Sequence, residues 1–176
     1  MSEMRQERSE HKAADETPHK SVEIHLEVPT AAGMRSLGAR LGALLRAGDL
    51  LVLTGDLGAG KTTLTQGIAE GLKVRGPITS PTFVIARVHP PLADGPALVH
   101  ADAYRLGGFA ELDDLDLDAI AEDSVTVVEW GRGLAEGLAD GRLEVIIERG
   151  DDASETRELK IIGVGERWSG LPAELA

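Results

Sequence analysis

Residues 50–62 read LLVLTGDLGAGKT, and this stretch decides the fold. It begins with a continuous apolar run, as expected of a buried parallel strand. From Gly55 onward it fits the pattern G-x-x-x-x-G-K-[ST] of a phosphate-binding loop, also called Walker A. Residues 63–72 then carry apolar side chains at helical spacing. The sequence therefore predicts a strand, a phosphate loop and a helix in succession.

Each part of this loop suits phosphate binding. Its glycines permit backbone conformations closed to other residues, so main-chain N–H groups can turn inward toward phosphate oxygens. The lysine supplies a cation, the threonine hydroxyl can ligate Mg²⁺, and the helix adds the positive end of its dipole. We therefore predict nucleotide contacts from Asp56, Leu57, Gly58, Ala59, Gly60, Lys61, Thr62 and Thr63. The alternative is a glycine-rich turn that binds nothing.

Composition limits the classes of protein that the chain can represent. A length of 176 residues suits one domain, and the absence of cysteine excludes disulfides and thiol catalysis. No apolar run approaches the roughly 18 residues of a membrane helix, so we expect a cytoplasmic protein without membrane association. Thirty acidic residues against 18 Lys and Arg give a net charge of −12. This balance argues against direct, tight nucleic-acid binding and favours a basic protein partner.

The pattern along the chain predicts one α/β domain over residues 21–163, between a disordered tail at 1–20 and a C-terminal tail at 164–176. Strands are expected at 21–28, 50–54, 83–89, 97–102, 125–128, 142–148 and 156–162, and helices at about 31–46, 63–72 and 109–121. Gly71 lies near the end of the second helix and weakens any continuation. The predicted fold is a P-loop NTPase-like sheet, with parallel strands around the phosphate loop, antiparallel additions and helices on both faces.

Two acidic residues end apolar strands. Asp102 is the last residue of the strand expected at 97–102, and Glu129 follows the strand expected at 125–128. Ligands of α/β proteins bind at the carboxyl edge of the sheet, so both side chains are candidates. One carboxylate can hold Mg²⁺, while the other orients the attacking water or accepts a proton. The alternative is that either residue caps the next segment or forms an ion pair.

Three further residues are weaker candidates. Thr82, in the proline-containing link SPTF, can sense an outer phosphate or simply begin a strand. Trp130 can belong to the core, cover the nucleotide or contact a partner. His100 lies on an apolar strand, where we expect a buried histidine with satisfied hydrogen bonds rather than a catalyst. The chain has no asparagine, so it lacks the Asn-Lys-x-Asp motif for guanine, and ATP is the expected nucleotide.

Taken together, four segments resemble the TsaE family of bacterial ATPases, which act in threonylcarbamoyladenosine modification of tRNA. The segments are GDLGAGKTTLTQGIAEGL from residue 55, SPTF from 80, HADAYRL from 100 and VVEW from 127, and the resemblance covers roughly residues 22–162. It implies that the loop binds ATP, that Thr62 and Glu129 hold Mg²⁺, and that Asp102 is important for activity. It also supports Thr82 and Trp130 and points to Arg157 near the nucleotide.

The resemblance further implies a function. Such an ATPase works with two partners, TsaB and TsaD, whose complex modifies an adenosine in tRNAs that read codons beginning with A. Contact with tRNA is then indirect, through the complex. Two alternatives stay open: a small-molecule kinase that uses the same loop, and a nucleotide-dependent binding module without significant turnover. A kinase usually carries a lid with arginines, whereas the arginines of this chain are scattered.

Overall fold

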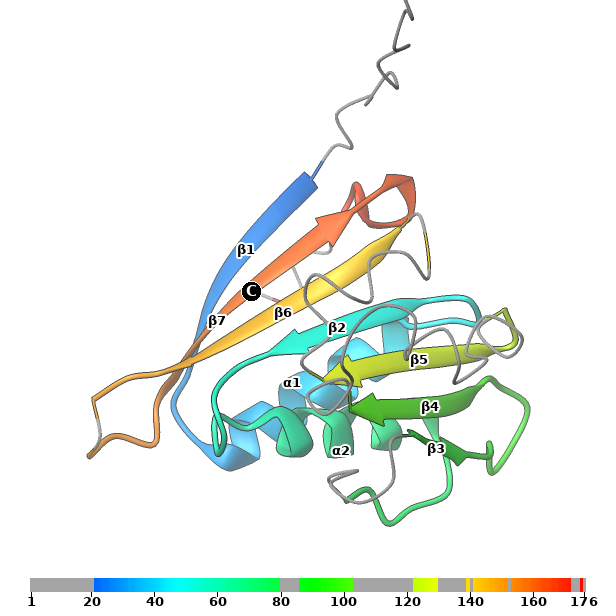
Figure 1. Cartoon of the computed structure of the whole chain (residues 1–176), viewed down its shortest axis with the longest axis horizontal. Helices are drawn as coiled ribbons and strands as arrows, with labels where there is room; N and C mark the ends of the chain where they lie inside the picture. Colours follow the sequence, from blue (N-terminus) through cyan, green and yellow to red (C-terminus); the bar gives the residue numbers. More distant parts are fainter. Residues whose placement is uncertain are drawn as a thin grey trace, which may run out of the picture.

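A mixed β-sheet organises the part of the chain that the structure describes, namely residues 21–79, 86–102, 122–129, 139, 141–151, 153–171 and 175 of a computed structural model. Seven strands in these ranges lie in the order β1-β7-β6-β2-β5-β4-β3 (Figure 1). They are β1 (Ser21–Val28), β2 (Leu50–Thr54), β3 (Ala86–His89), β4 (Ala97–Asp102), β5 (Ser124–Glu129), β6 (Arg142–Arg149) and β7 (Arg157–Val164). The described helices are α1 (Ala31–Leu44), α2 (Lys61–Leu72) and the short 3-10 helix η2 (Glu166–Trp168).

The centre of the sheet is parallel and its margins are antiparallel. Strand β2 pairs in parallel with β5 and β6, and β4 pairs in parallel with β5. The pairs β3–β4, β6–β7 and β1–β7 are antiparallel. The predicted α/β class, with parallel strands around the phosphate loop and antiparallel additions, is therefore confirmed. The strands expected at 83–89 and 97–102 form the antiparallel pair β3 and β4, and residues 83–85 lie outside the described ranges.

Burial explains why the central strands are apolar throughout. Every residue of β5 is buried, and so are the first four of β2, as expected for strands covered on both faces. Strands β6 and β7 alternate instead, and only one of their faces joins the core. Parallel β2, β5 and β4 end at the same edge of the sheet, where their arrowheads point in Figure 1. That edge carries the phosphate loop and the two predicted acids.

Helices α1 and α2 lie side by side against one face of the sheet (Figure 1), and both contribute to its hydrophobic core. The Thr30 side chain caps α1 by accepting a hydrogen bond from the Gly33 N–H at 3.0 Å. The helix expected over residues 109–121 lies outside the described ranges, so helices on the second face stay a prediction. None of the described helices combines the length and apolar character needed to cross a membrane.

Glycines let the two helices approach closely. A Cβ at Gly38 would lie 2.3 Å from the Leu64 carbonyl oxygen, and one at Gly71 would lie 2.3 Å from that of Ala39. Helix α2 ends at Leu72, one residue after Gly71, as the sequence predicts, and Gly71 also admits the neighbouring helix. The end of α2 is set by Lys73, which adopts the left-handed conformation with φ of 58° and caps the last turn.

The described residues after Gly163 remain attached to the sheet. Strand β7 runs through Val164, and the Trp168 side chain is buried at 3 % exposure. Arg167 donates hydrogen bonds to both carboxylate oxygens of Asp49 and to the carbonyl of Leu44. These contacts join this segment to the start of β2 and the end of α1.

Candidate nucleotide-binding site

The phosphate loop adopts the open conformation that its glycines permit. Gly58 and Gly60 have φ of 79° and 115°, values that side chains with a Cβ rarely adopt. Gly55 is small for another reason, because a Cβ there would lie 2.8 Å from the Ile147 carbonyl oxygen. The loop leads directly into α2, whose first N–H groups have no partner within the helix. Main-chain donors therefore gather where the positive end of the helix dipole lies.

Lys61 begins α2 and turns back over the loop. Its side chain is buried, and its Nζ donates hydrogen bonds to the carbonyl oxygens of Gly55, at 2.5 Å, and Asp56, at 3.2 Å. Burial lowers the pKa of the Lys61 ammonium, while the carboxylates of Glu129, Asp102 and Asp56 oppose this shift. The loop thus holds a partly desolvated cation beside its main-chain donors, a combination that favours a polyanion.

The two predicted acids lie next to each other at the end of their strands. Asp102 on β4 and Glu129 on β5 are direct partners in the parallel ladder, and Glu129 also pairs with Leu53 of β2. Both carboxylates are buried, Glu129 at 2 % and Asp102 at 7 % exposure. Glu129 is therefore on the strand adjoining the phosphate loop, and Asp102 is one strand farther away.

Glu129 has the arrangement expected of a metal ligand. Its Oε1 is buried and has no hydrogen-bond partner among the described residues, which leaves an acceptor available for a cation. Thr62, in the first turn of α2, is half-buried. No cluster of three or more acidic, histidine or cysteine side chains suited to a metal occurs in the described ranges. These residues fit Mg²⁺, which is usually held by one or two protein ligands together with phosphates and water.

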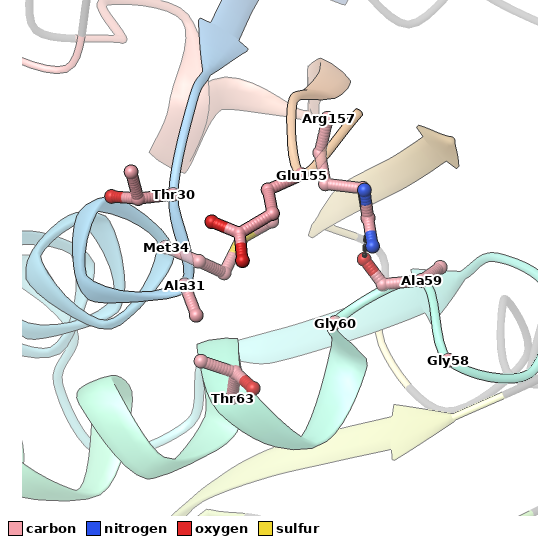
Figure 2. Close-up of a pocket in the computed structure, with 9 residues that line it drawn as sticks. All are labelled: Thr30, Ala31, Met34, Gly58, Ala59, Gly60, Thr63, Glu155 and Arg157. Carbon is pink, nitrogen blue, oxygen red and sulfur yellow. Dashed lines mark hydrogen bonds between the residues drawn. The ribbon is translucent and has the colours of Figure 1, made fainter. Parts of the chain in front are cut away.

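Beside the loop lies a cavity of about 210 Å³ (Figure 2). Its lining combines predicted and unpredicted residues: Thr30, Ala31, Met34, Gly58, Ala59, Gly60, Thr63, Glu155 and Arg157. Arg157 on β7 donates from Nε to the Ala59 carbonyl at 3.0 Å and from one terminal nitrogen to the carbonyls of Ser154 and Thr156. Figure 2 shows the Glu155 carboxylate pointing into the space between α1 and the loop.

The predicted site residues thus fall into two adjoining groups. Gly58, Ala59, Gly60, Thr63 and Arg157 line the cavity. Lys61, at the start of α2, lies close enough to Asp102 and Glu129 at the strand ends for their charges to act on it. Leu57 does not line this cavity, and it is 88 % exposed. Thr82 and Trp130 lie outside the described residues. No local motif marks the other lining residues, Thr30, Ala31, Met34 and Glu155, so the sequence does not predict them.

Comparisons with known proteins identify the family of the chain. The family model described as "Threonylcarbamoyl adenosine biosynthesis protein TsaE" matches residues 28–159. The "tRNA threonylcarbamoyladenosine biosynthesis protein TsaE" of Streptomyces coelicolor is 63 % identical over 139 residues, which cover 77 % of this chain and 94 % of that protein. The protein of the same name from Bacillus subtilis is 41 % identical over 136 residues, covering 76 % and 82 %.

A solved structure shares the fold. The chain titled "Crystal structure of Bacillus subtilus YdiB" superposes with a TM-score of 0.70 and 33 % sequence identity, over 89 % of this chain and 96 % of that one. The family match spans the phosphate loop, both strand-end acids and Arg157. The chain therefore belongs to the TsaE family of threonylcarbamoyladenosine biosynthesis proteins.

Proposed function

We propose that this chain is a Mg²⁺-dependent ATPase that supports threonylcarbamoyladenosine modification of tRNAs reading codons that begin with A, acting on a TsaB–TsaD transferase complex. The observation that carries the proposal is the convergence of three features at one sheet edge. They are a glycine-opened loop at the start of α2, the buried Lys61 and the adjacent carboxylates of Asp102 and Glu129.

The phosphate loop binds the triphosphate of ATP. Lys61 exchanges its hydrogen bonds with the Gly55 and Asp56 carbonyls for bonds to outer phosphate oxygens. The added negative charge acts in the same direction as the nearby carboxylates and opposes the burial that lowers the Lys61 pKa. Binding of the triphosphate therefore stabilises the charged form of Lys61, which burial alone disfavours.

The metal is assigned to Thr62 and Glu129. Held by these residues, Mg²⁺ would supply charge neutralisation on the phosphates. The free Oε1 of Glu129, on the strand next to the loop, supports this residue as the metal ligand. Asp102 lies one strand farther out and is assigned to orienting the attacking water or accepting its proton.

The nucleoside is assigned to the cavity beside the loop. Arg157 donates hydrogen bonds, in the plane of its guanidinium group, to three carbonyl oxygens. These bonds fix the guanidinium plane and leave its face available for stacking on the base. Glu155 supplies hydrogen-bond acceptors in the same cavity, and the exocyclic amino group of adenine is a suitable donor. The absence of any asparagine, and hence of the usual guanine motif, supports ATP over GTP.

The family membership and the net charge of the chain support the proposed protein partners. The net charge of −12 disfavours direct capture of tRNA and suits docking to a protein complex. We infer that hydrolysis by this subunit allows repeated cycles of the TsaB–TsaD transferase. Slow hydrolysis by the chain alone, altered when the partners are present, is the expected behaviour.

Reconstitution tests the proposal. Purified TsaB, TsaD, unmodified tRNA and the modification precursor are combined with or without this chain, ATP and Mg²⁺, and modified tRNA is counted per transferase. More than one round of modification should require the chain together with hydrolysable ATP. Modification that proceeds equally without the chain would contradict the role. Rapid transfer of phosphate to a metabolite, with no effect of the partners, would support the kinase alternative.

A further inference from the structure

We propose that His100 is a positioning residue for Glu129: its Nε2–H holds one carboxylate oxygen, so that the other faces the metal position. The proposal rests on the proposed function and adds a residue to its metal site. The sequence alone suggests an ordinary buried histidine with satisfied hydrogen bonds. The structure differs, since neither ring nitrogen of His100 has a hydrogen-bond partner among the described residues.

The position of the ring favours this role over a packing role. His100 is completely buried at 0 % exposure, between the apolar neighbours Val99 and Ala101 on β4. A buried polar group without a partner costs about 1–3 kcal/mol. An apolar side chain of similar volume would avoid that cost, so the imidazole contributes little to stability here. Its polar atoms need another explanation.

The β-ladder brings His100 to Glu129. His100 and Asp102 are two residues apart on β4, so their side chains share a face of the sheet. On β5 the direct partners of these residues are Val127 and Glu129, which makes Glu129 the diagonal neighbour of His100. The nearest approach is 3.6 Å, between His100 Nε2 and Glu129 Oε2.

The two oxygens of Glu129 therefore have different surroundings. Oε2 faces the imidazole, whereas Oε1 has no partner in the described part of the chain. A separation of 3.6 Å exceeds the usual N–H···O range of 2.7–3.2 Å, and a movement of about 0.5 Å closes it. Carboxylates that ligate metals are commonly fixed by a second hydrogen bond. The neutral imidazole with its proton on Nε2 supplies that bond.

Manganese binding tests the proposal without relying on turnover. Mn²⁺ affinity of the ATP-loaded protein is measured by electron paramagnetic resonance for the wild type, His100→Leu and His100→Gln. The leucine variant lacks the donor and should bind Mn²⁺ roughly 10–100-fold more weakly. The glutamine amide can donate from nearly the same place and should restore most of the affinity. ATP affinity without metal, and the folding of the free protein, should be unchanged by either substitution.

Two controls separate positioning from general disruption. Thr126→Val removes a buried hydroxyl that also lacks a described partner, on the face of β5 opposite to Glu129, and should leave Mn²⁺ affinity unchanged. In a Glu129→Gln background, His100→Leu should have no additional effect on Mn²⁺ affinity, because the group that it positions is already lost. This cycle remains informative if the single leucine variant loses some stability.

The outcomes distinguish this inference from the proposed function. If the wild type binds ATP and Mn²⁺ and His100→Leu binds the metal equally well, the positioning role is wrong and the function stands. Equal losses in the leucine and glutamine variants would also overturn it, since they would indicate shape rather than hydrogen bonding. If the wild type binds no nucleotide with metal, the proposed function fails, and the inference fails with it.

Discussion

The Nε of Arg157 donates a hydrogen bond of 3.0 Å to the carbonyl oxygen of Ala59, which joins β7 to the phosphate loop across 98 positions of sequence. The Ala59 side chain is itself completely buried. An antiparallel strand added to the sheet thereby fixes the backbone of a loop that belongs to its parallel centre. The loop conformation depends on this distant strand as well as on its own glycines.

Replacement of Arg157 should therefore weaken ATP binding. In Arg157→Gln the Ala59 carbonyl loses a charged donor, an interaction worth about 1.5–3 kcal/mol, which corresponds to a loss of roughly 10-fold or more in affinity. Calorimetric titration with ATP measures the effect. Arg142→Gln is the matched control, because Arg142 pairs with Glu144 at the opposite end of the β6–β7 hairpin. Equal ATP affinity in Arg157→Gln and wild type would show that the contact is dispensable.

Removal of the loop cation should abolish stabilisation by nucleotide. ATP at about 100 times its dissociation constant should raise the free energy of unfolding of the wild type by about 2.7 kcal/mol. Lys61→Ala loses the phosphate cation and should show little or no increase at the same concentration. Thermal unfolding with and without ATP measures this difference, with Lys160→Ala, at an exposed ion pair with Glu23, as control. An equal thermal shift in wild type and Lys61→Ala would count against the site.

Substitutions of the two strand-end acids, Glu129 and Asp102, should have different effects on metal response and hydrolysis. Glu129→Gln should weaken the response to Mg²⁺ and remove metal-dependent hydrolysis while sparing most ATP binding without metal. Asp102→Asn should lower the hydrolysis rate while leaving the Mg²⁺ concentration for half-maximal activity unchanged, because it is placed one strand farther from the loop. Steady-state rates across a Mg²⁺ series distinguish the two. A reversed pattern would exchange the assigned roles.

Substitution of Gly67 should destabilise the fold, although helix propensity alone favours alanine over glycine by about 1 kcal/mol. A Cβ at Gly67 would lie 2.1 Å from the Arg35 carbonyl oxygen, so α1 and α2 would have to separate. We expect Gly67→Ala to lower the free energy of unfolding by about 1–3 kcal/mol. Urea unfolding measures it, with Gly95→Ala as a control because no atom lies within 4 Å of a Cβ there. Stability at or above that of the wild type would disprove the close helix contact.

His89 should make stability fall in mild acid. Burial lowers its pKa, only partly opposed by the hydrogen bond between its Nδ1 and the Arg75 carbonyl. Below about pH 6.5 the unfolded chain binds a proton that the folded chain resists, so the free energy of unfolding decreases as pH falls from there through the folded pKa.

Urea unfolding at about pH 8 and about pH 5.5 measures this effect on either side of the ordinary histidine pKa. His89→Gln should lose less stability between the two conditions than the wild type does. An unchanged pH dependence in His89→Gln would exclude His89 as the source.

The features that the sequence predicted are those marked by local patterns. Strand β2, the loop and α2 followed from an apolar run, a glycine–lysine motif and helical spacing, all within 23 consecutive residues. Asp102 and Glu129 followed from their place at strand ends, although their adjacency needed the strand order. The contact of Gly71 with α1 did not follow from the sequence, because a glycine near the end of a helix and one that admits a neighbouring helix look alike there.

The cavity could not be predicted in the same way. Thr30 and Met34 come from the start of α1, and Glu155 comes from the segment between β6 and β7. The β1–β7–β6 extension brings these distant segments to the loop. For His100, the sequence shows an apolar strand but not which side chains will lie around the ring. Its position beside Glu129 depends on the register between β4 and β5.

Calorimetric titration of the purified chain with ATP, in the presence and absence of Mg²⁺, tests the central claim most directly. We predict one ATP bound per chain, with an affinity that falls when Mg²⁺ is removed and falls further in Lys61→Ala. Absence of binding by either ATP or ADP in the presence of Mg²⁺ would contradict the account.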